Sequence, residues 1–163
     1  MKKAIAVIVL ILLLAGFGTP VLSGILMERT LKQTFSQINQ MYAETGTGLS
    51  YEIIDYDRSF LTSKIEWKIK LGNIKSFYGT DEIVFVDSAK HGFTSVVSTT
   101  SLEKNLWFMD FLDQKLDGKN PLNISTEYRY SGNFIVTIAL DGFDWEQADE
   151  VFDCMPGQLV VKV

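Results

Sequence analysis

The chain has 163 residues, which is enough for one domain of ordinary size together with a targeting segment and too few for a second full domain. From Gly24 onward 13 basic residues face 20 acidic ones, a formal charge of −7, and this balance makes nucleic acid and anionic lipid headgroups poor partners. The single cysteine, Cys154, cannot close a disulfide within the chain, so folding does not depend on an oxidising compartment.

The first 27 residues have the pattern of a bacterial export signal. Lys2 and Lys3 precede an apolar run, and no charged residue occurs from Ala4 to Met27. Because the positive end of such a segment stays in the cytoplasm, we expect the rest of the chain to be exported. At about 1.5 Å per helical residue, this run is also long enough to span a hydrocarbon core of about 30 Å.

Two interpretations of this segment compete. Val21 and Ser23 are small enough for the pocket positions of a cleavage site after Ser23, and Pro20 loosens the helix before them. Against cleavage, the apolar run continues to Met27, and apolar residues then follow one face of a helix beyond it: Met27, Leu31, Phe35, Ile38 and Tyr42. We favour an uncut anchor, because one continuous helix explains both observations.

This interpretation divides the chain into three parts: a transmembrane helix over residues 1–27, an extension helix over 28–47, and a β-rich domain over 48–163. The expected location is the inner membrane, crossed once, with the C-terminal domain in the periplasm. The alternative is a protein secreted to the periplasm after cleavage at Ser23.

The body of the chain predicts strands in sequential hairpins. Glycines at 46 and 48 end the helix, and side chains then alternate between apolar and polar over 49–53 and 65–71, with a bulge where Ile53 and Ile54 break the alternation. Further strands are expected over 83–89, 93–100, 122–130 and 134–140. Ser101 resembles the N-cap of an amphipathic helix over 102–116.

The C-terminal segment predicts one more strand. Pro156 and Gly157 make a turn, and the valine-rich run over 159–163 has high β propensity. We expect this strand to pair inside the sheet near residues 134–140, because a free valine-rich edge invites aggregation. One helix among antiparallel strands, without a βαβ rhythm, predicts an α+β domain with a mainly antiparallel sheet and one packed amphipathic helix.

Candidates for chemistry are few. His91 is the one histidine, at an expected turn next to Gly92, and it lacks the companions of a catalytic or metal-binding imidazole. An acidic stretch could attract a cation but lacks the spacing of a calcium loop, and we interpret it as a solvated, partly helical face; it holds Asp141, Asp144, Glu146, Asp149, Glu150 and Asp153. We therefore predict no catalytic residue, no cofactor and no metal site, and a protein that is not an enzyme.

The string YDRSFLTS, Tyr56 to Ser63, is the most unusual in the chain, and we interpret it as a structural corner between two strands. It also resembles the first strand pair of the YdgA-like family of bacterial envelope proteins of unknown function (DUF945). Members are similar elsewhere too, at an N-terminal apolar helix with a Gly and a Glu, at a His-Gly turn and at a Tyr-Ser-Gly turn. The matching residues here are Gly24, Glu28, His91, Gly92 and Tyr130 to Gly132.

The resemblance implies a periplasmic protein anchored in the inner membrane, and it transfers no catalytic residue. This chain has Ser59 and Phe93 where the family usually has Gly and Pro. Family members are typically far longer, so the chain resembles their N-terminal portion.

Two functions are compatible with these features. The first is a non-enzymatic envelope module that contacts other envelope proteins or the membrane surface. The second is a carrier or chaperone for a lipid or other apolar ligand, since 11 Phe, 6 Tyr and 3 Trp could line an apolar groove. Against the carrier, a set of aromatic residues can instead fill the core between helix and sheet: Trp67, Trp107, Phe108 and Phe111.

Overall fold

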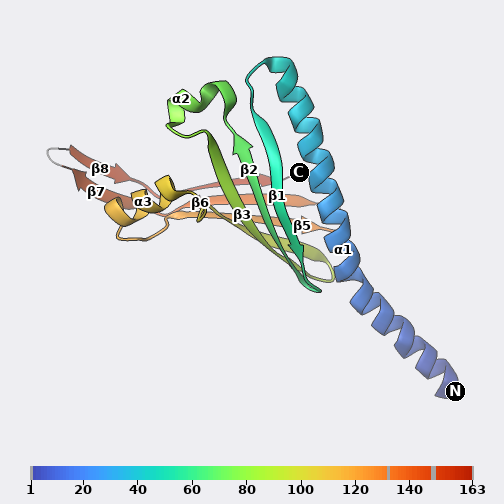
Figure 1. The fold of residues 1–163 in the computed structure, drawn as a ribbon. Helices are drawn as coiled ribbons and strands as arrows, with labels where there is room; N and C mark the ends of the chain where they lie inside the picture. Colours follow the sequence, from blue (N-terminus) through green and yellow to red (C-terminus); the bar gives the residue numbers. More distant parts are fainter. Residues whose placement is uncertain (1, 132, 148–149, 163) are drawn as a thin grey trace.

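The computed structural model describes the backbone of residues 2–131, 133–147 and 150–162, and the side chains of residues 18, 21–76, 79–131, 133–144 and 154–162. It consists of one long helix, a seven-stranded antiparallel sheet, a short helix packed on that sheet, and a separate two-stranded hairpin (Figure 1). The α+β class and the dominance of antiparallel strands agree with the sequence prediction.

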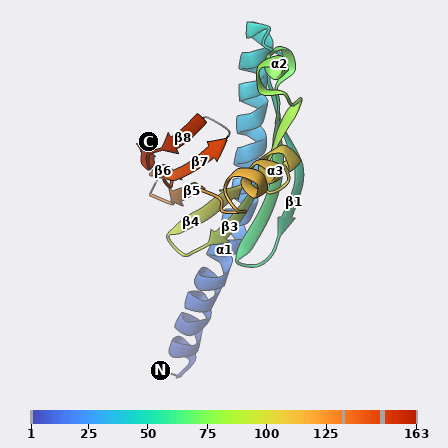
Figure 2. The ribbon, with the colours of Figure 1, turned by 90° about the vertical axis from the view of Figure 1, so that its left-hand side faces the viewer.

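Helix α1 runs without interruption from Lys2 to Thr45 and ends where Gly46 takes a left-handed φ of 68°. The predicted apolar face is the face turned to the sheet, since its residues are half-buried while most of their neighbours are exposed: Met27, Leu31, Phe35, Ile38 and Tyr42. The N-terminal part of α1 extends beyond the sheet (Figure 2). Among the helical residues whose side chains are described, none form a stretch long and apolar enough to cross a membrane.

The large sheet has the order β1-β2-β3-β4-β5-β6-β9, and every neighbouring pair is antiparallel. Its strands are β1 (Ser50–Arg58), β2 (Thr62–Lys70), β3 (Glu82–His91), β4 (Ser95–Ser101), β5 (Leu122–Arg129), β6 (Phe134–Leu140) and β9 (Gly157–Lys162). All predicted strands are therefore present, β6 with the predicted bounds and the others with shifted ends, and the predicted bulge lies between Ile53 and Asp55. The strong twist of the sheet leaves β1 nearly parallel to the axis of α1, whereas β5 and β6 run across that axis (Figure 1).

Both packed helices lie on the face of the sheet that carries Trp67 and Phe85. On this face Ile65 is fully buried, while Lys64 and Lys70 on the opposite face are exposed. Helix α3 (Leu106–Lys115) supplies most of a compact core, whose buried members are Leu102, Phe108, Leu112 and Leu116. Helix α1 covers the same face further along, through an aromatic row that it shares with β1, β2 and β3.

The aromatic row crosses three strands. Trp67 stacks on Phe85 with ring centroids 4.3 Å apart and on Tyr51 at 6.4 Å. From α1, Phe35 approaches Trp67 at 5.4 Å, and Tyr42 stacks on Tyr51 at 6.1 Å. Aromatic pairs contribute about 0.5–1.5 kcal/mol each beyond the burial of their area, so the pairs that involve α1 join it to the sheet by more than simple burial.

The predicted start of the packed helix was wrong. Helix α3 begins after Asn105, because Ser101 is still paired with Val86 in the β3–β4 ladder, and its hydroxyl accepts the Glu103 N–H at 3.1 Å. Asn105 instead bridges to β3, where its Oδ1 accepts the Val84 N–H at 2.8 Å and its Nδ2 donates to the Val84 carbonyl.

The described residues of the acidic stretch, 141–147 and 150–153, are not helical. They form a hairpin of β7 (Phe143–Gln147) and β8 (Glu150–Cys154), because Phe143 to Gln147 alternates with the period of a strand. The structure also contains a turn of 3₁₀-helix, η1 (Gly72–Ile74), and the short helix α2 (Lys75–Tyr78) between β2 and β3, which the sequence analysis did not anticipate.

The predicted place of the last strand is confirmed. Strand β9 pairs antiparallel with β6, with Val161 opposite Val136 and Leu159 opposite Ile138. The side chains of β9 are exposed from Gly157 to Lys162. Strand β9 is therefore an edge strand of the sheet, and its exposed side chains contribute little to the core.

Candidate functional site

The most unusual arrangement of side chains lies where α1 crosses the end of the sheet. His91, the last residue of β3, is only 4% exposed. Its Nε2 lies 2.7 Å from the Ser63 hydroxyl on β2, and its Nδ1 lies 3.3 Å from the Ser23 hydroxyl on α1. One imidazole thus joins the helix to two strands.

Tyr56 makes a second connection at the same place. Its hydroxyl donates to the Gly24 carbonyl of α1 at 3.0 Å and lies 3.4 Å from the Ser63 hydroxyl. A Cβ at Gly24 would come within 2.9 Å of Cδ of Arg58, so the absence of a side chain lets β1 lie directly against the helix. We call the six residues of this arrangement the junction cluster: Ser23, Gly24, Tyr56, Arg58, Ser63 and His91.

Electrostatics keeps the junction cluster neutral at its centre. Burial, with a further contribution from the Arg58 guanidinium, lowers the pKa of His91 below its usual value. Burial also raises the pKa of the Tyr56 hydroxyl. A neutral imidazole has one N–H donor and one acceptor nitrogen, and two hydroxyls, which can each donate or accept, satisfy both.

A serine and a histidine at 2.7 Å raise the question of nucleophilic catalysis. In such sites a third group orients the imidazole through its second nitrogen, and the serine faces a substrate. Here the second nitrogen faces Ser23, and Ser63 is buried at 3% exposure. The arrangement suits a buried structural hydrogen-bond network between helix and sheet.

Two more polar contacts hold α1 against the sheet. The Asn39 side chain pairs with the backbone of Tyr51 at the outer edge of β1, donating to its carbonyl at 2.8 Å and accepting its N–H at 2.7 Å. Past the end of the helix, Asn73 donates from its backbone to the Thr47 carbonyl at 3.1 Å and from its side chain to the Gly46 carbonyl at 2.9 Å. The helix is therefore fastened at its middle, along β1 and at its end.

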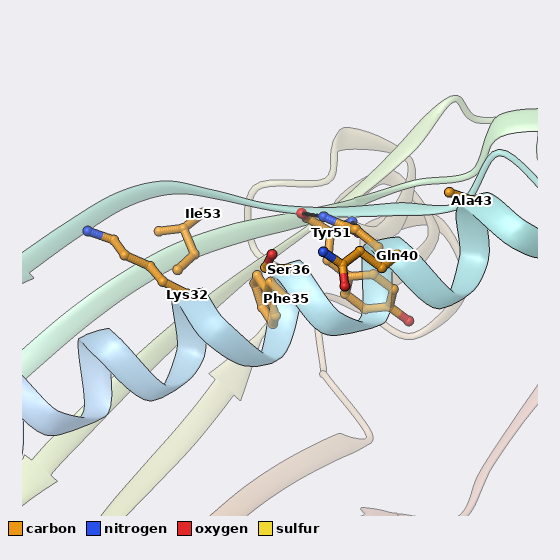
Figure 3. Close-up of a pocket in the computed structure, with 8 residues that line it drawn as sticks. Lys32, Phe35, Ser36, Gln40, Ala43, Tyr51 and Ile53 are labelled. Carbon is orange, nitrogen blue, oxygen red and sulfur yellow. Dashed lines mark hydrogen bonds between the residues drawn. The ribbon is translucent and has the colours of Figure 1, made fainter.

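A groove of about 580 Å³ follows the line where α1 meets β1 (Figure 3). Its walls combine apolar groups with polar ones, and they include Lys32, Phe35, Ser36, Gln40, Tyr51 and Ile53. An apolar ligand in this groove would lie against the polar side chains that α1 contributes, Lys32, Ser36 and Gln40.

The other candidate residues from the sequence, namely the aromatic residues, Cys154 and the acidic stretch, lie at separate places in the structure. Phe108 and Phe111 belong to the α3 core and Trp67 to the aromatic row, but Trp107 is 46% exposed. Cys154 is half-exposed at the end of β8. Asp141 and Asp144 are exposed, and the side chains of the other four acidic residues lie outside the described residues. Within the described part of the chain, no three metal-ligating side chains come together.

Sequence reasoning missed a half-buried acid. Asp87 of β3 lies on the helix-covered face, where it accepts the Trp67 indole N–H at 2.8 Å and the Thr100 hydroxyl at 2.5 Å. Burial raises the pKa of this carboxyl, and the two hydrogen bonds partly oppose the effect. The alternation in β3 was the available signal, because it puts Asp87 on the same side as Phe85.

The residues that carry the family resemblance gather at one end of the sheet. Gly24, Tyr56, Ser63 and His91 belong to the junction cluster, and the Tyr130 hydroxyl donates to the Gly92 carbonyl at 3.0 Å beside it. Comparison with known proteins gives a match to the family model described as bacterial protein of unknown function (DUF945), over residues 1–163. No curated protein and no solved structure matches the chain. Because the family model spans every residue, the chain belongs to the DUF945 family of bacterial proteins of unknown function.

Proposed function

We propose that the protein is a membrane-anchored, non-enzymatic module of the bacterial envelope, in which α1 holds the sheet at a set position on the periplasmic side of the inner membrane. The observation that carries this proposal is the continuity of α1. One helix begins at Lys2, runs through the charge-free segment Ala4–Met27 and continues to Thr45 along the sheet. A rigid connection of this kind transmits the orientation of an anchor to a domain, whereas a flexible linker does not.

The junction cluster supports an uncut chain. Cleavage after Ser23 would remove the hydroxyl that faces His91 and would make Gly24 the new N-terminus. Gly24 is buried against Arg58, so cleavage would put a new ammonium group beside an existing guanidinium. The first change takes a hydrogen-bond partner from the buried imidazole, and the second brings two positive charges together, so both are unfavourable.

The side chains at the centre of the site support a structural role. Both nitrogens of the one imidazole face hydroxyls within the protein, and Ser63 is shielded from solvent. The carrier alternative rests on the groove between α1 and β1, where Phe35 and Ile53 offer apolar surface but the polar side chains of α1 would also lie against an apolar ligand. It is tested by native mass spectrometry of protein purified without detergent, in which a co-purifying lipid would favour it.

The anchor and the periplasmic location are tested together. Cells expressing the full chain are fractionated, membranes are washed with alkaline carbonate, and spheroplasts are treated with an external protease. We expect the protein to stay in the washed membranes and its C-terminal domain to be cut in spheroplasts but not in intact cells. Release by carbonate, or protection in spheroplasts, contradicts the proposal.

A further inference from the structure

Two loops lie beside the junction cluster at the end of the sheet. The β1–β2 loop, residues 59–61, is closed by a hydrogen bond from the Ser59 N–H to the Thr62 carbonyl at 2.8 Å. The β3–β4 loop, residues 92–94, is closed by one from the Gly92 N–H to the Ser95 carbonyl at 2.8 Å. The His91 N–H donates to the Leu61 carbonyl at 2.7 Å and so ties the two loops together.

Along the axis of α1, the two loops lie level with Ser23 and Gly24. His91 contacts Ser23, and Arg58, directly before the first loop, packs on Gly24. Both ribbon views show these turns next to the middle of α1, with only the N-terminal part of the helix projecting beyond them (Figures 1 and 2). The loops therefore form the end of the domain that faces the anchor.

This height falls inside the charge-free segment. Gly24 precedes Glu28, the first charged residue after that segment, by four residues, which is about 6 Å along a helix. The whole segment of 24 residues is about 36 Å long, somewhat more than a hydrocarbon core of about 30 Å. If the segment crosses the bilayer, Ser23 and Gly24 lie at the outer boundary of the hydrocarbon, and so do the loops at their height.

The tips of the loops carry large apolar side chains that the domain leaves accessible. Phe93 is 67% exposed, Leu61 48% and Phe60 47%. On α1, the exposed side chains at the same height are also apolar, namely Leu22, Ile25 and Leu26. Aromatic and aliphatic side chains gathered around the emerging end of a membrane helix match the boundary between headgroups and acyl chains.

We propose that Phe60, Leu61 and Phe93 insert into the outer boundary of the bilayer, so that the end of the sheet rests on the membrane around α1. This inference rests on the proposed anchor and adds a second, independent membrane contact. The lipid surface is the occupant because the apolar tips continue the apolar surface of α1 at the depth where that helix leaves the hydrocarbon. Arg58, whose stem lies against Gly24, is placed to extend its guanidinium toward the headgroups.

The test places a fluorescent probe at the loop in the full chain. In a Cys154→Ser background, Phe93→Cys is labelled with an environment-sensitive dye and reconstituted into vesicles of phosphatidylethanolamine with a minor share of phosphatidylglycerol. Leu61→Cys provides a second position in case the first variant folds poorly. The matched control is Leu106→Cys, which is also apolar and 80% exposed but lies on α3, away from this end of the sheet.

We expect emission from the two loop probes to shift to the blue in vesicles, to be quenched by nitroxide-bearing lipids and to resist iodide in water. The control probe should be quenched by iodide and not by the lipids. Vesicle flotation separates the two proposals: protein that fails to float contradicts the anchor. Protein that floats with loop probes open to iodide refutes the loop insertion alone. A loop probe shielded from iodide but not quenched by the lipids assigns the loops to a second protein surface, and also refutes the insertion.

Discussion

Replacing His91 is the most severe test of the hydrogen bonds that hold α1 against the sheet. His91→Leu keeps a side chain of similar bulk but removes both nitrogens, so the hydroxyls of Ser23 and Ser63 lose their imidazole contacts at 3.3 and 2.7 Å. A buried polar group left without a partner costs about 1–3 kcal/mol. Ser63 retains the Tyr56 hydroxyl at 3.4 Å and Ser23 retains a further interaction, so both costs fall at the low end of that range.

We therefore expect His91→Leu to lower the free energy of unfolding by about 1–3 kcal/mol. The measurement is urea unfolding of the full chain in detergent, followed by circular dichroism. The control is Lys90→Leu, the same replacement at the exposed position next in the strand, which should change stability by about 0.5 kcal/mol or less. Equal stability of His91→Leu and the control would refute the fastening.

The pH dependence of the stability difference between His91→Leu and the natural chain gives an independent test. Burial and Arg58 lower the pKa of His91 in the folded state below the 6.5 of an unperturbed imidazole. The unfolded state therefore binds more protons as pH falls below about 6.5, and the folded protein loses stability until pH reaches its own lower pKa. The His91→Leu variant lacks this loss, so its deficit relative to the natural chain should narrow as pH falls through that window. A deficit that widens would contradict the assignment of His91 as a buried neutral group.

Three further substitutions or deletions probe the rest of the fold. Gly72→Ala should lower the free energy of unfolding by about 3–5 kcal/mol, because Gly72 has a φ of +51° and a Cβ there would meet the Gly48 carbonyl. The control is Gly79→Ala, where φ is +68° but no described atom lies within 4 Å of the added Cβ. This control should lose only about 1–2 kcal/mol in the same urea titration. Asp87→Asn should raise stability at neutral pH and not below about pH 4, since burial raises the pKa of this carboxyl and makes its charged form unfavourable; an unchanged pH profile would count against this reasoning. Deleting residues 158–163 removes the pairing of β9 with β6 and should lower the melting temperature, whereas loss of self-association at constant melting temperature would show that the strand serves as an interface.

Local patterns predicted the elements of this fold well. The strand that carries Ile65 and Trp67 alternates without interruption, and the half-buried face of α1 follows the apolar spacing from Met27 to Tyr42. Even the long-range pairing of β9 with β6 followed from the need to cover a valine-rich edge. In these cases the side chain itself reveals whether it faces the core or the solvent.

The errors came from polar residues whose partners lie far away in sequence. Ser101 is a good helix cap by type, but pairing with β3 keeps it in a strand, and Asn105 takes the position before the helix. Asn39 and His91 resemble ordinary surface residues until the fold brings Tyr51 and Ser23 to them, over separations of 12 and 68 residues. Hydrogen bonds of this kind depend on tertiary geometry, which a local pattern does not contain.

The most direct test of the account is the intact mass of the mature protein isolated from cell membranes. Ser23 and Gly24 belong to an unbroken helix that is fastened to the sheet through His91 and Tyr56. We therefore expect a mass that includes residues 1–23. A mass that begins at Gly24 would show that the segment is removed, and would contradict both the anchor and the role of the junction cluster in holding it.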